Sequence, residues 1–264
     1  MLDSPFSKTD QRRQLLLKAL SERGAMTIPE MMELAGCSKA TIVRDLDLLA
    51  GRGLIIRTIN GAQPQPSPGP SGQELSFQEK KHLQSAEKMA IARRAVSLVE
   101  EGDVIGLTGG TTTFLIAWLL RSRVNITVVT NAVNIAASLA ESEGVQVVVT
   151  GGVMRGKSYE LCGPLALKTL EDLHIGKMFL GVDGVSLENG LTTHSEFEAQ
   201  TNRLFIAHAQ QTYAVFDHTK WERTSLFPIA PLSSANALIT DKPPSAAMLD
   251  RLRAENIPVY VAKP

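Results

Sequence analysis

The chain has 264 residues with 27 basic and 27 acidic side chains, and this formal net charge of zero by itself mildly disfavours nucleic-acid binding. Hydrophobic residues make up 44% of the chain, enough for one large or two ordinary domains, so disorder is excluded for most of it. No stretch reaches the roughly 18 uncharged apolar residues of a membrane helix, and the first residues lack a signal peptide's basic end and apolar stretch, so we expect a cytoplasmic protein with no membrane partner.

Residues 1–62 predict a small helical domain that ends in a hairpin. Helices are expected over residues 11–22, from Pro29 onward, and over residues 39–50 behind Ser38, because Pro favours a first helical turn and Ser favours a cap. Residues 53–61 contain a short apolar run and an Asn-Gly turn, which favour a β-hairpin. The residues expected to form the core are Leu16, Leu20, Met31, Leu34, Ile42, Leu46 and Leu49.

The second and third helices are joined by a tight turn at Gly36 and Cys37. A tight turn followed by a helix that opens with small polar residues is the arrangement that places a helix N-terminus in the DNA major groove. Periodicity alone fits a three-helix dimerisation module equally well. The segment holds nine basic and seven acidic residues, a net charge of +2 that leaves −2 for the remainder. The candidate DNA contacts are Ser38, Lys39, Ala40, Thr41 and Arg44, with Arg57 in the hairpin.

A proline-rich stretch, QPQPSPGPSG at residues 63–72, separates this segment from the rest of the chain. Its prolines predict an extended linker, because they exclude a helix or a central strand. We therefore expect a helical domain over residues 1–62, a linker over residues 63–72 and a second domain over residues 73–264.

The second domain alternates short β-branched runs with amphipathic stretches. Strands are expected at residues 104–107, 126–129, 145–149, 178–182, 213–216, 237–239 and 259–261, and helices at residues 88–99, 112–120, 132–141, 164–173 and 246–255. This alternation predicts an α/β fold with a mostly parallel sheet covered on both faces. In such a fold, ligands bind beyond the carboxyl ends of the strands.

Small or polar residues follow most of the predicted strands, although any one of them also fits a simple turn. Residues 109–112, Gly-Gly-Thr-Thr, follow a strand and open a helix, so free amides, two hydroxyls and the helix dipole converge there, as a phosphate site requires. A threonine at such a position can cap the helix and also donate to phosphate. The absence of a G-x-G-x-x-G pattern argues against a dinucleotide cofactor. Other strand ends supply Asn131, Gly151, Gly152, Asp183, Asp217 and Lys220.

Residues 151–158, GGVMRGKS, satisfy the phosphate-loop pattern G-x-x-x-x-G-K-[ST], and MFLGVD at residues 178–183 resembles a strand that ends in a magnesium-binding Asp. This alternative would make the protein a nucleotide hydrolase that depends on Lys157. A phosphate loop has to run directly into a helix, and Gly163 and Pro164 stop any helix that begins at Lys157. The pattern is therefore weak evidence for nucleotide binding.

The segment from His194 to Arg203 predicts a helix with Ser195 as N-cap and Glu198 as the third helical residue, a capping box that accounts for Glu198 structurally. Glu198 also shares a helix face with Asn202, where both side chains can hydrogen-bond sugar hydroxyls. Neither the five histidines nor the two cysteines have metal-ligand spacing, and no Ser-His-Asp or Cys-His relay is readable. We therefore expect no metal and no catalytic residues.

Short motifs run in order along both domains. The first domain carries SKATIVRDL at 38–46 and GLIIR at 53–57; the second carries EKMAIA at 87–92, GTT at 110–112, VTN at 129–131, TGG at 150–152, CGPLA at 162–166, VDG at 182–184, GLTT at 190–193, DHTK at 217–220 and ITD at 239–241. In this order they resemble the DeoR family of bacterial transcriptional regulators. The resemblance also explains the phosphate-loop pattern, because TGG is similar to a family motif.

The resemblance implies a winged helix-turn-helix that binds operator DNA, joined to a sensor domain related in fold to sugar-phosphate isomerases. It implies a repressor of a sugar-catabolic operon, acting as a homo-oligomer (dimer or tetramer) and released from double-stranded operator DNA by a phosphorylated sugar, with no enzymatic activity. Carried over position by position, the ligand contacts fall at Lys88, Gly110, Thr111, Thr112, Asn131, Gly151, Gly152, Asp183, Glu198, Asp217 and Lys220.

The chain departs from the family's pattern at four positions. Val43 replaces a usual Arg in the recognition helix, which removes one DNA contact, and Asn60 replaces a usual Gly in the wing. Asn202 replaces a usual Lys, and Thr108 a frequent Asp, which bears on the preference for sugar phosphates. A rival hypothesis is an isomerase-like enzyme with a DNA-binding appendage. It needs a positioned acid–base pair, and the replacement of Lys at position 202 counts against it.

Overall fold

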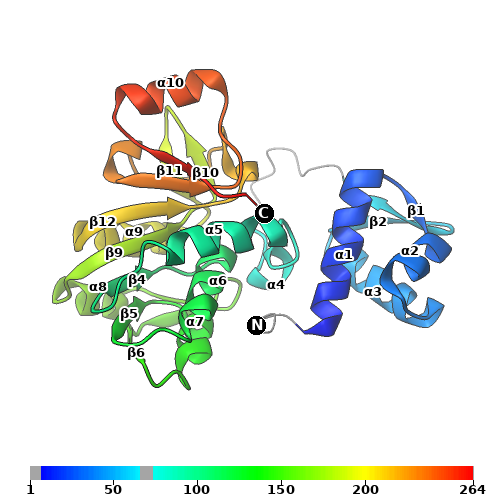
Figure 1. Ribbon diagram of the computed structural model, residues 1–264, viewed down its shortest axis with the longest axis horizontal. Helices are drawn as coiled ribbons and strands as arrows, with labels where there is room; N and C mark the ends of the chain where they lie inside the picture. Colours follow the sequence, from blue (N-terminus) through cyan, green and yellow to red (C-terminus); the bar gives the residue numbers. More distant parts are fainter. Residues whose placement is uncertain (1–6, 66–73, 264) are drawn as a thin grey trace. The chain divides into compact units, whose positions relative to one another are not determined.

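The structure, a computed structural model, describes residues 7–65 and 74–263, which form two compact units (Figure 1). The first unit contains the N-terminal residues together with residues 78–85. The second contains the stretch that ends at Phe77 and the residues from Ala86 onward. The first unit therefore takes in a piece of the chain that the sequence assigned to the second domain.

The first unit consists of three helices and a small antiparallel sheet. The helices are α1 (Lys8–Arg23), α2 (Ile28–Ala35) and α3 (Lys39–Gly51), and the strands, in the order β1-β3-β2, are β1 (Met26–Thr27), β2 (Ile55–Thr58) and β3 (Gly61–Pro64). The predicted core residues are buried except for Leu34, which is partly buried. The helices and the β2–β3 hairpin confirm the prediction of a winged helix-turn-helix, whereas β1 is an addition that no sequence pattern indicated.

Capping interactions fix both ends of α2 and the start of α3. The Thr27 N–H donates to Glu30 Oε2 at 2.7 Å and the Glu30 N–H donates to Thr27 Oγ1 at 3.5 Å, so the two residues form a capping box. Gly36 takes the left-handed conformation, with φ of 58°, and ends α2. Ser38 then caps α3 as predicted.

The predicted linker begins later than expected, because Gln63 and Pro64 belong to β3. β3 is the central strand of its sheet, so the expectation that this stretch forms no central strand is wrong at its first two residues. Pro64 fits there because β1 pairs with β3 only up to Ala62, and the position of Pro64 faces Ile55 of β2 alone. Residues 66–73, most of the remaining linker, lie outside the described residues.

Residues 78–85 pack against α1 within the first unit. Lys81 Nζ lies 3.1 Å from Asp10 Oδ1, and Gln14 Nε2 donates to the Lys81 carbonyl at 3.2 Å. Leu83 packs against the core of this unit. These contacts join segments far apart in the sequence, so no local pattern could have placed the boundary here.

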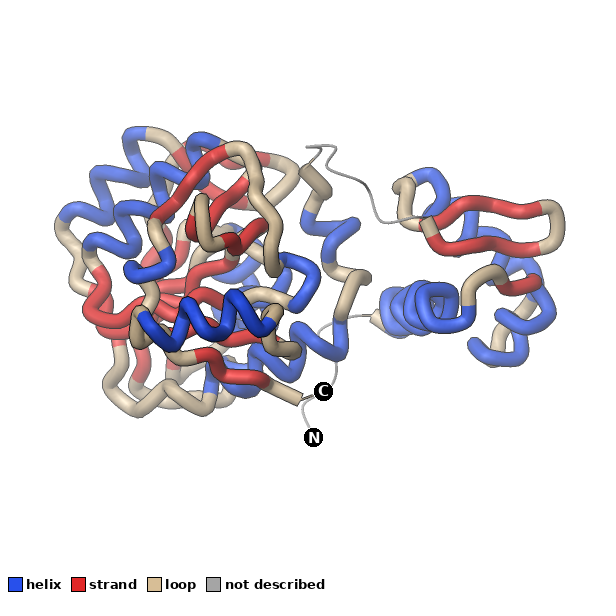
Figure 2. The backbone as a smooth tube through the Cα atoms, turned by 90° about the horizontal axis from the view of Figure 1, so that it is seen from above, coloured by secondary structure: helices blue, strands red, loops and turns tan. Residues whose placement is uncertain are grey.

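A seven-stranded parallel sheet forms the centre of the second unit (Figure 2). Its strands follow the order β15-β14-β12-β9-β4-β5-β6. Every strand predicted for this unit is present: β4 (Val104–Leu107), β5 (Ile126–Thr130), β6 (Val145–Val149), β9 (Ile175–Gly181), β12 (Ala209–Val215), β14 (Ala237–Thr240) and β15 (Val259–Val261). The parallel pairing confirms the predicted α/β fold.

Helices cover both faces of this sheet. They are α5 (Ser85–Val96), α6 (Thr111–Leu120), α7 (Val133–Leu139), α8 (Pro164–Glu171), α9 (Glu196–Ala207) and α10 (Ala246–Ala254). Helices α6 and α7 pack together on one face, and α8 and α9 pack together on the other, as right-handed crossovers require (Figure 1). This winding places the loops that follow the central strands along one edge.

Several shorter elements have no counterpart in the predicted pattern. They are the hairpin β7 (Val153–Arg155) and β8 (Glu160–Cys162), the antiparallel sheet β10 (Gly184–Ser186), β11 (Gly190–Thr193) and β13 (Phe227–Ala230), the short helix α4 (Phe77–Lys80) and the 3-10 turns η1 (His218–Lys220) and η2 (Leu232–Ser234). The β7–β8 hairpin follows the edge strand β6 and lies beside the predicted ligand residues.

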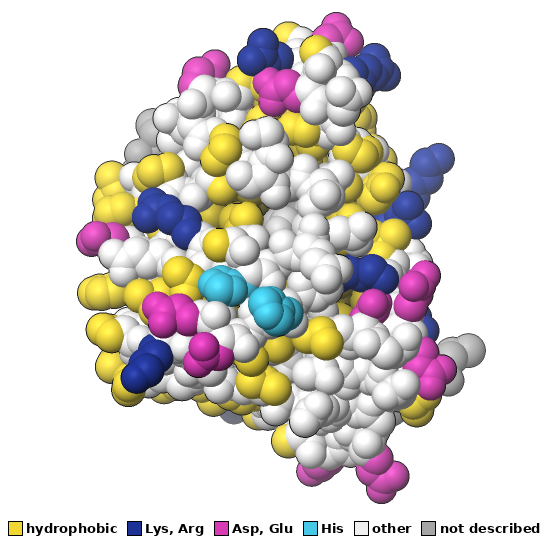
Figure 3. All heavy atoms as spheres, turned by 90° about the vertical axis from the view of Figure 1, so that its left-hand side faces the viewer, with side chains coloured by type: hydrophobic (Ala, Val, Ile, Leu, Met, Phe, Trp, Pro, Cys, Tyr) yellow, Lys and Arg dark blue, Asp and Glu magenta, His cyan; other side chains and the backbone are white. Residues whose placement is uncertain are grey.

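Among the described residues, no helix combines the length and the apolar character needed to cross a bilayer. Within the same part of the chain, no group of three or more His, Cys, Asp or Glu side chains is arranged to hold a metal ion. The face of the second unit shown in Figure 3 mixes basic, acidic and hydrophobic side chains without a continuous basic track.

Candidate functional site

The N-terminus of α3 presents short polar and basic side chains to solvent. Ser38, Lys39, Ala40 and Arg44 are exposed, and Thr41 is half-buried. Ser38 Oγ accepts from the Thr41 N–H at 3.4 Å and lies 3.0 Å from Thr41 Oγ1. The two hydroxyls therefore hold the cap, while the basic side chains beside them stay open to a partner, as at a helix that enters a DNA groove.

Ion pairs fix α3 in its place. The Asp45 carboxylate, 2% exposed, accepts from Arg12 Nε at 2.6 Å and from Arg13 Nε at 2.8 Å, which ties α3 to α1. Arg57 in the wing lies 3.4 Å from Asp47 on α3. Arg57 therefore has a bracing role between wing and helix in addition to its predicted role at DNA.

The loop that enters α6 carries the residues predicted to bind an anion. Gly110 is the N-cap, with φ of 145°, and no side chain caps this helix within the described structure. The expectation that a threonine caps α6 is wrong, because Gly110 occupies that position and the Thr113 hydroxyl donates back to its carbonyl at 3.1 Å. The first amides of α6 are left for an anion, with the helix dipole behind them.

Two lysines reach the same edge from different elements. Lys88 on α5 lies 4.0 Å from Asp217, and Lys220 on η1 lies 3.9 Å from Asp183. Burial raises the pKa of Asp217, but Lys88, Lys220 and Thr219 outweigh it and bring the pKa below its usual value. Four predicted ligand residues are thus held as two ion pairs before any ligand arrives.

Glu160 on β8 is a site residue that sequence reasoning missed. It is fully buried, and its carboxyl accepts from Asn131 Nδ2 at 3.3 Å. Its side chain packs against Gly109, where a Cβ would overlap it. Burial raises the pKa of Glu160, with Ser158, Arg155 and Asn131 opposing that rise in part. No spacing pattern marks Glu160, because topology alone brings β8 beside the loop before α6.

Arg155 on β7 is the second residue absent from the predicted site. Its guanidinium lies 2.7 Å from Glu74, 3.2 Å from Glu198 and 3.8 Å from Glu160. Burial lowers the pKa of Arg155, but these carboxylates outweigh it and raise the pKa. Ser195 makes no side-chain cap on α9, so the predicted capping box is wrong, and Glu198 turns to Arg155 instead.

The phosphate-loop pattern at residues 151–158 belongs to the β7–β8 hairpin and enters no helix. Lys157 Nζ donates to the Glu74 carbonyl at 3.4 Å. Gly152 packs against the Cys162 backbone, which explains why this position takes glycine, and Gly151 has open space around it. The nucleotide-hydrolase alternative is wrong, because the loop lacks the strand-to-helix geometry that cradles phosphates.

Thr108 and Asn202, the two positions in the second unit that depart from the family's usual residues, have different surroundings. Thr108 Oγ1 accepts from the Gly181 N–H at 2.9 Å, which joins the ends of β4 and β9. Asn202 is fully buried, and among the described residues neither atom of its amide has a hydrogen-bond partner; Asn131 Oδ1 shares that property. A buried unpaired polar group costs roughly 1–3 kcal/mol, so both amides are suited to a bound polar molecule.

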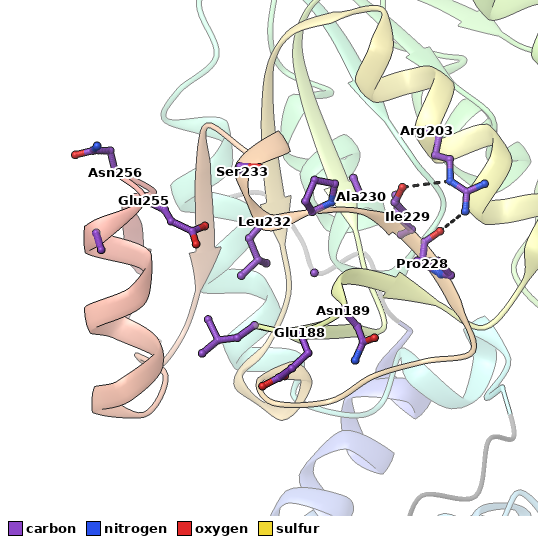
Figure 4. Close-up of a pocket in the computed structure, with 14 residues that line it drawn as sticks. Glu188, Asn189, Arg203, Pro228, Ile229, Ala230, Leu232, Ser233, Glu255 and Asn256 are labelled. Atoms are coloured by element: carbon purple, nitrogen blue, oxygen red, sulfur yellow. Dashed lines mark hydrogen bonds between the residues drawn. The ribbon is translucent and has the colours of Figure 1, made fainter.

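A separate hollow of about 800 Å³ lies between the β10–β11 turn, β13 and the end of α10 (Figure 4). Its lining includes Glu188 from the β10–β11 turn and Glu255 from the end of α10. Arg203 is the basic residue in its lining, and its guanidinium donates to the carbonyls of Pro228 and Ile229. The lining includes none of the predicted ligand residues, so this hollow is distinct from the candidate anion site.

Two family models match most of the chain: residues 12–66 match a DeoR-like helix-turn-helix domain and residues 83–242 a DeoR C-terminal sensor domain. The chain is 36% identical to a putative aga operon transcriptional repressor of Escherichia coli O157:H7, covering 96% of this chain and 94% of that protein. It is 31% identical to the L-fucose operon activator of Haemophilus influenzae, covering 88% and 91%. Ribose 5-phosphate isomerase A from Methanocaldococcus jannaschii is similar over 52% of this chain and 55% of that chain, with 19% identity and a TM-score of 0.40.

Proposed function

The chain belongs to the DeoR family of transcriptional regulators, and on this basis we propose that it represses a sugar-catabolic operon in the cytoplasm. The first unit binds double-stranded operator DNA. The second unit binds a phosphorylated sugar without a further cofactor, and this binding releases the protein from the DNA. The named relatives include a repressor and an activator, so the sign of regulation is part of what the experiment has to measure.

The uncapped N-terminus of α6, at the same edge of the sheet as Lys88 and Lys220, carries this proposal. Amides at a helix N-terminus bind phosphate, and two nearby lysines add charge-assisted contacts. Asp183 and Glu198, at the same edge, offer carboxylate oxygens that accept hydrogen bonds from hydroxyls. One edge of the sheet thus carries partners for both the phosphate and the hydroxyls of a sugar phosphate.

The test begins by selecting, from a random library of DNA duplexes, those that the full-length protein binds. This selection is needed because the operator sequence also has to be identified. A thermal-shift screen of phosphorylated pentoses and hexoses, with the unphosphorylated sugars as controls, identifies binders. A binder that lowers the affinity for the selected duplex supports repression relieved by effector. A binder that raises the affinity reverses the sign of regulation, and the absence of any phosphorylated binder contradicts the proposed sensor.

We also propose that the chain acts as a homo-oligomer, because paired half-sites on DNA match a symmetric protein. Large exposed hydrophobic side chains gather around the β7–β8 hairpin and the neighbouring elements, and clusters of this kind mark interaction surfaces. They are Val133, Val149, Val153, Met154, Leu165 and Phe197. A second copy of the chain is the partner that we assign to this surface.

Two substitutions matched for exposure test this assignment, since Val153 and Leu226 are each 76% exposed. Val153→Glu places a charge inside the surface, and Leu226→Glu places one outside it. We expect mass photometry to show a smaller assembly for Val153→Glu and an unchanged one for Leu226→Glu. Equal assembly in both variants would place the interface elsewhere.

A further inference from the structure

Residues 74–88, called here the connecting segment, are held near the ligand edge at both ends. Glu74 pairs with Arg155 at one end, and Lys88 pairs with Asp217 at the other. The middle of the segment, residues 78–85, belongs to the first unit. The connecting segment therefore runs from the candidate effector site into the DNA-binding unit and back to the site.

The beginning of the connecting segment is fastened by more than the ion pair. The Phe77 N–H donates to the Lys157 carbonyl at 2.7 Å. The Phe77 ring packs edge-on against Phe114 of α6 and against Tyr159, with centroids 5.5 Å apart in each case. The fastening thus involves the β7–β8 hairpin and the helix whose N-terminus forms the anion site.

Arg155 is shared among more carboxylates than one guanidinium can neutralise. Glu74, Glu160 and Glu198 surround it, and Glu160 packs against Gly109 of the anion site. An anion bound at the α6 amides therefore adjoins a cluster in which three carboxyl groups compete for one guanidinium. Guanidinium groups form strong paired hydrogen bonds with phosphate, so the bound anion competes for Arg155.

The three contacts of Arg155 differ in how firmly their partners are held. Glu160 belongs to β8 and Glu198 to α9, and both are buried in packed elements. Glu74 precedes the first helical turn of its segment and belongs to no helix or strand. The contact with Glu74 is therefore the one that gives way when Arg155 turns toward a bound anion.

We propose that Arg155 is an effector-binding residue and a switch: without effector it holds Glu74, and on effector binding it turns to the phosphate and frees the start of the connecting segment. This inference rests on the proposed function, since it assigns the route by which that effector acts. A ligand can shift such an equilibrium only through different contacts in the two states, and Arg155 supplies that difference.

Hydrogen exchange of the full-length protein tests the switch, with inorganic phosphate as the probe and chloride at equal ionic strength as the control. A thermal shift first establishes the phosphate concentration that saturates the protein. In the wild type we expect phosphate to speed exchange in peptides covering residues 75–85 by about fivefold or more, the lower end of typical coupling between sites.

Glu74→Gln removes the charge that holds Arg155 and keeps the size of the side chain. We expect this variant to exchange residues 75–85 about fivefold faster without phosphate, and to respond to phosphate by less than about twofold, because the contact that phosphate breaks is already lost. Glu87→Gln makes the same substitution in the same segment outside the Arg155 cluster, and we expect it to behave as the wild type does.

The outcomes separate the switch from the function on which it rests. If phosphate stabilises the protein and residues 75–85 exchange unchanged, or if Glu74→Gln responds as the wild type does, the switch is overturned and the sensor proposal stands. If neither phosphate nor any phosphorylated sugar stabilises the protein, both are overturned.

Discussion

The two units use charged side chains in opposite ways. At the N-terminus of α3, Lys39 and Arg44 are exposed to solvent. At the ligand edge of the second unit, Lys88 is 5% exposed and its partner Asp217 is 2% exposed. Exposed charges suit a protein that has to bind DNA, a long polyanion, reversibly. Buried ion pairs suit a site that has to distinguish the chemical groups of a small ligand.

This difference has a consequence for how each surface responds to its surroundings. Exposed charges interact through water, so salt screens them strongly, and DNA binding by α3 should weaken steeply as salt increases. Buried pairs are screened much less, and losing one partner leaves the other charge without compensation. Substitutions that remove a charge should therefore cost stability at buried pairs and affinity at the exposed helix.

The largest expected effect is at Asp45, whose buried carboxylate pairs with two guanidinium groups in the first unit much as buried Asp217 pairs with Lys88 in the second. Asp45→Ala leaves the guanidinium groups of Arg12 and Arg13 facing each other across an emptied position. We expect the first unit to lose about 3 kcal/mol of unfolding free energy. Hydrogen exchange of the α3 amides measures this in the full chain, because both tryptophans, Trp118 and Trp221, belong to the second unit.

Asp47→Ala is the matched control on the same helix. Asp47 is 61% exposed and pairs with Arg57, so we expect its removal to cost less than about 0.5 kcal/mol. Equal losses of unfolding free energy from Asp45→Ala and Asp47→Ala would mean that burial does not make an ion pair more important for stability in this protein.

The next largest effect is expected at Arg44, on the exposed side of the comparison. Arg44→Ala should weaken operator binding by about 2 kcal/mol, roughly thirtyfold, and reduce the dependence on salt, because it removes a contact to a base or phosphate. A mobility-shift titration at two salt concentrations measures both quantities. Lys18→Ala, on the exposed face of α1, should leave both nearly unchanged, and undiminished binding by Arg44→Ala would remove α3 from the DNA interface.

The contrast between the two units also explains what the sequence could predict. Ser38, Lys39 and Arg44 are readable because a cap, a turn and a helix lie within a few consecutive residues. The parallel strands are readable because each is a short β-branched run between helical patterns. From those strands alone, Asn131 and Asp183 could be assigned to one edge.

The site and boundary features that could not be predicted from the sequence depend on contacts between distant segments. Arg155 and Glu160 reach the ligand edge because a hairpin folds back beside α6 and α9, and no spacing rule encodes that path. Glu198 looked like half of a capping box, and its choice of Arg155 over Ser195 is likewise a tertiary effect. Pro64 was assigned to the linker, because the sequence around a proline does not reveal that it pairs with a residue of another strand, here Ile55 of β2.

On the buried side of the comparison, we expect Lys220→Ala to weaken binding of inorganic phosphate by about tenfold, or about 1.4 kcal/mol, the loss of one charge-assisted contact. Lys220 is 24% exposed and lies 3.9 Å from Asp183, so its removal also leaves that carboxylate less compensated. Calorimetric titration of the full chain measures the affinity. Lys168→Ala, on α8, is the control, and equal affinities for the two variants would place the anion elsewhere.

The smallest effect that we expect is a pH dependence confined to the first unit. His82, 2% exposed, lies 3.6 Å from Asp10. Burial, with the charge of the neighbouring Lys81, lowers the pKa of His82 from 6.5 to about 4 despite the opposing carboxylate of Asp10. Between these values the unfolded chain binds a proton at this ring and the folded chain does not, so stability falls as the pH drops from 6.5 toward 4.

We expect the first unit to lose about 1 kcal/mol of unfolding free energy between roughly pH 7 and pH 5.5, measured by hydrogen exchange of α1 corrected for the intrinsic effect of pH. His82→Leu should abolish this loss, because the unfolded chain then has no ring to protonate at that position. His174→Leu, an exposed histidine in the second unit, should leave it intact. If His82→Leu keeps the full pH dependence, another group titrates there, and the packing of residues 78–85 against α1 is not what sets the acid sensitivity of the DNA-binding unit.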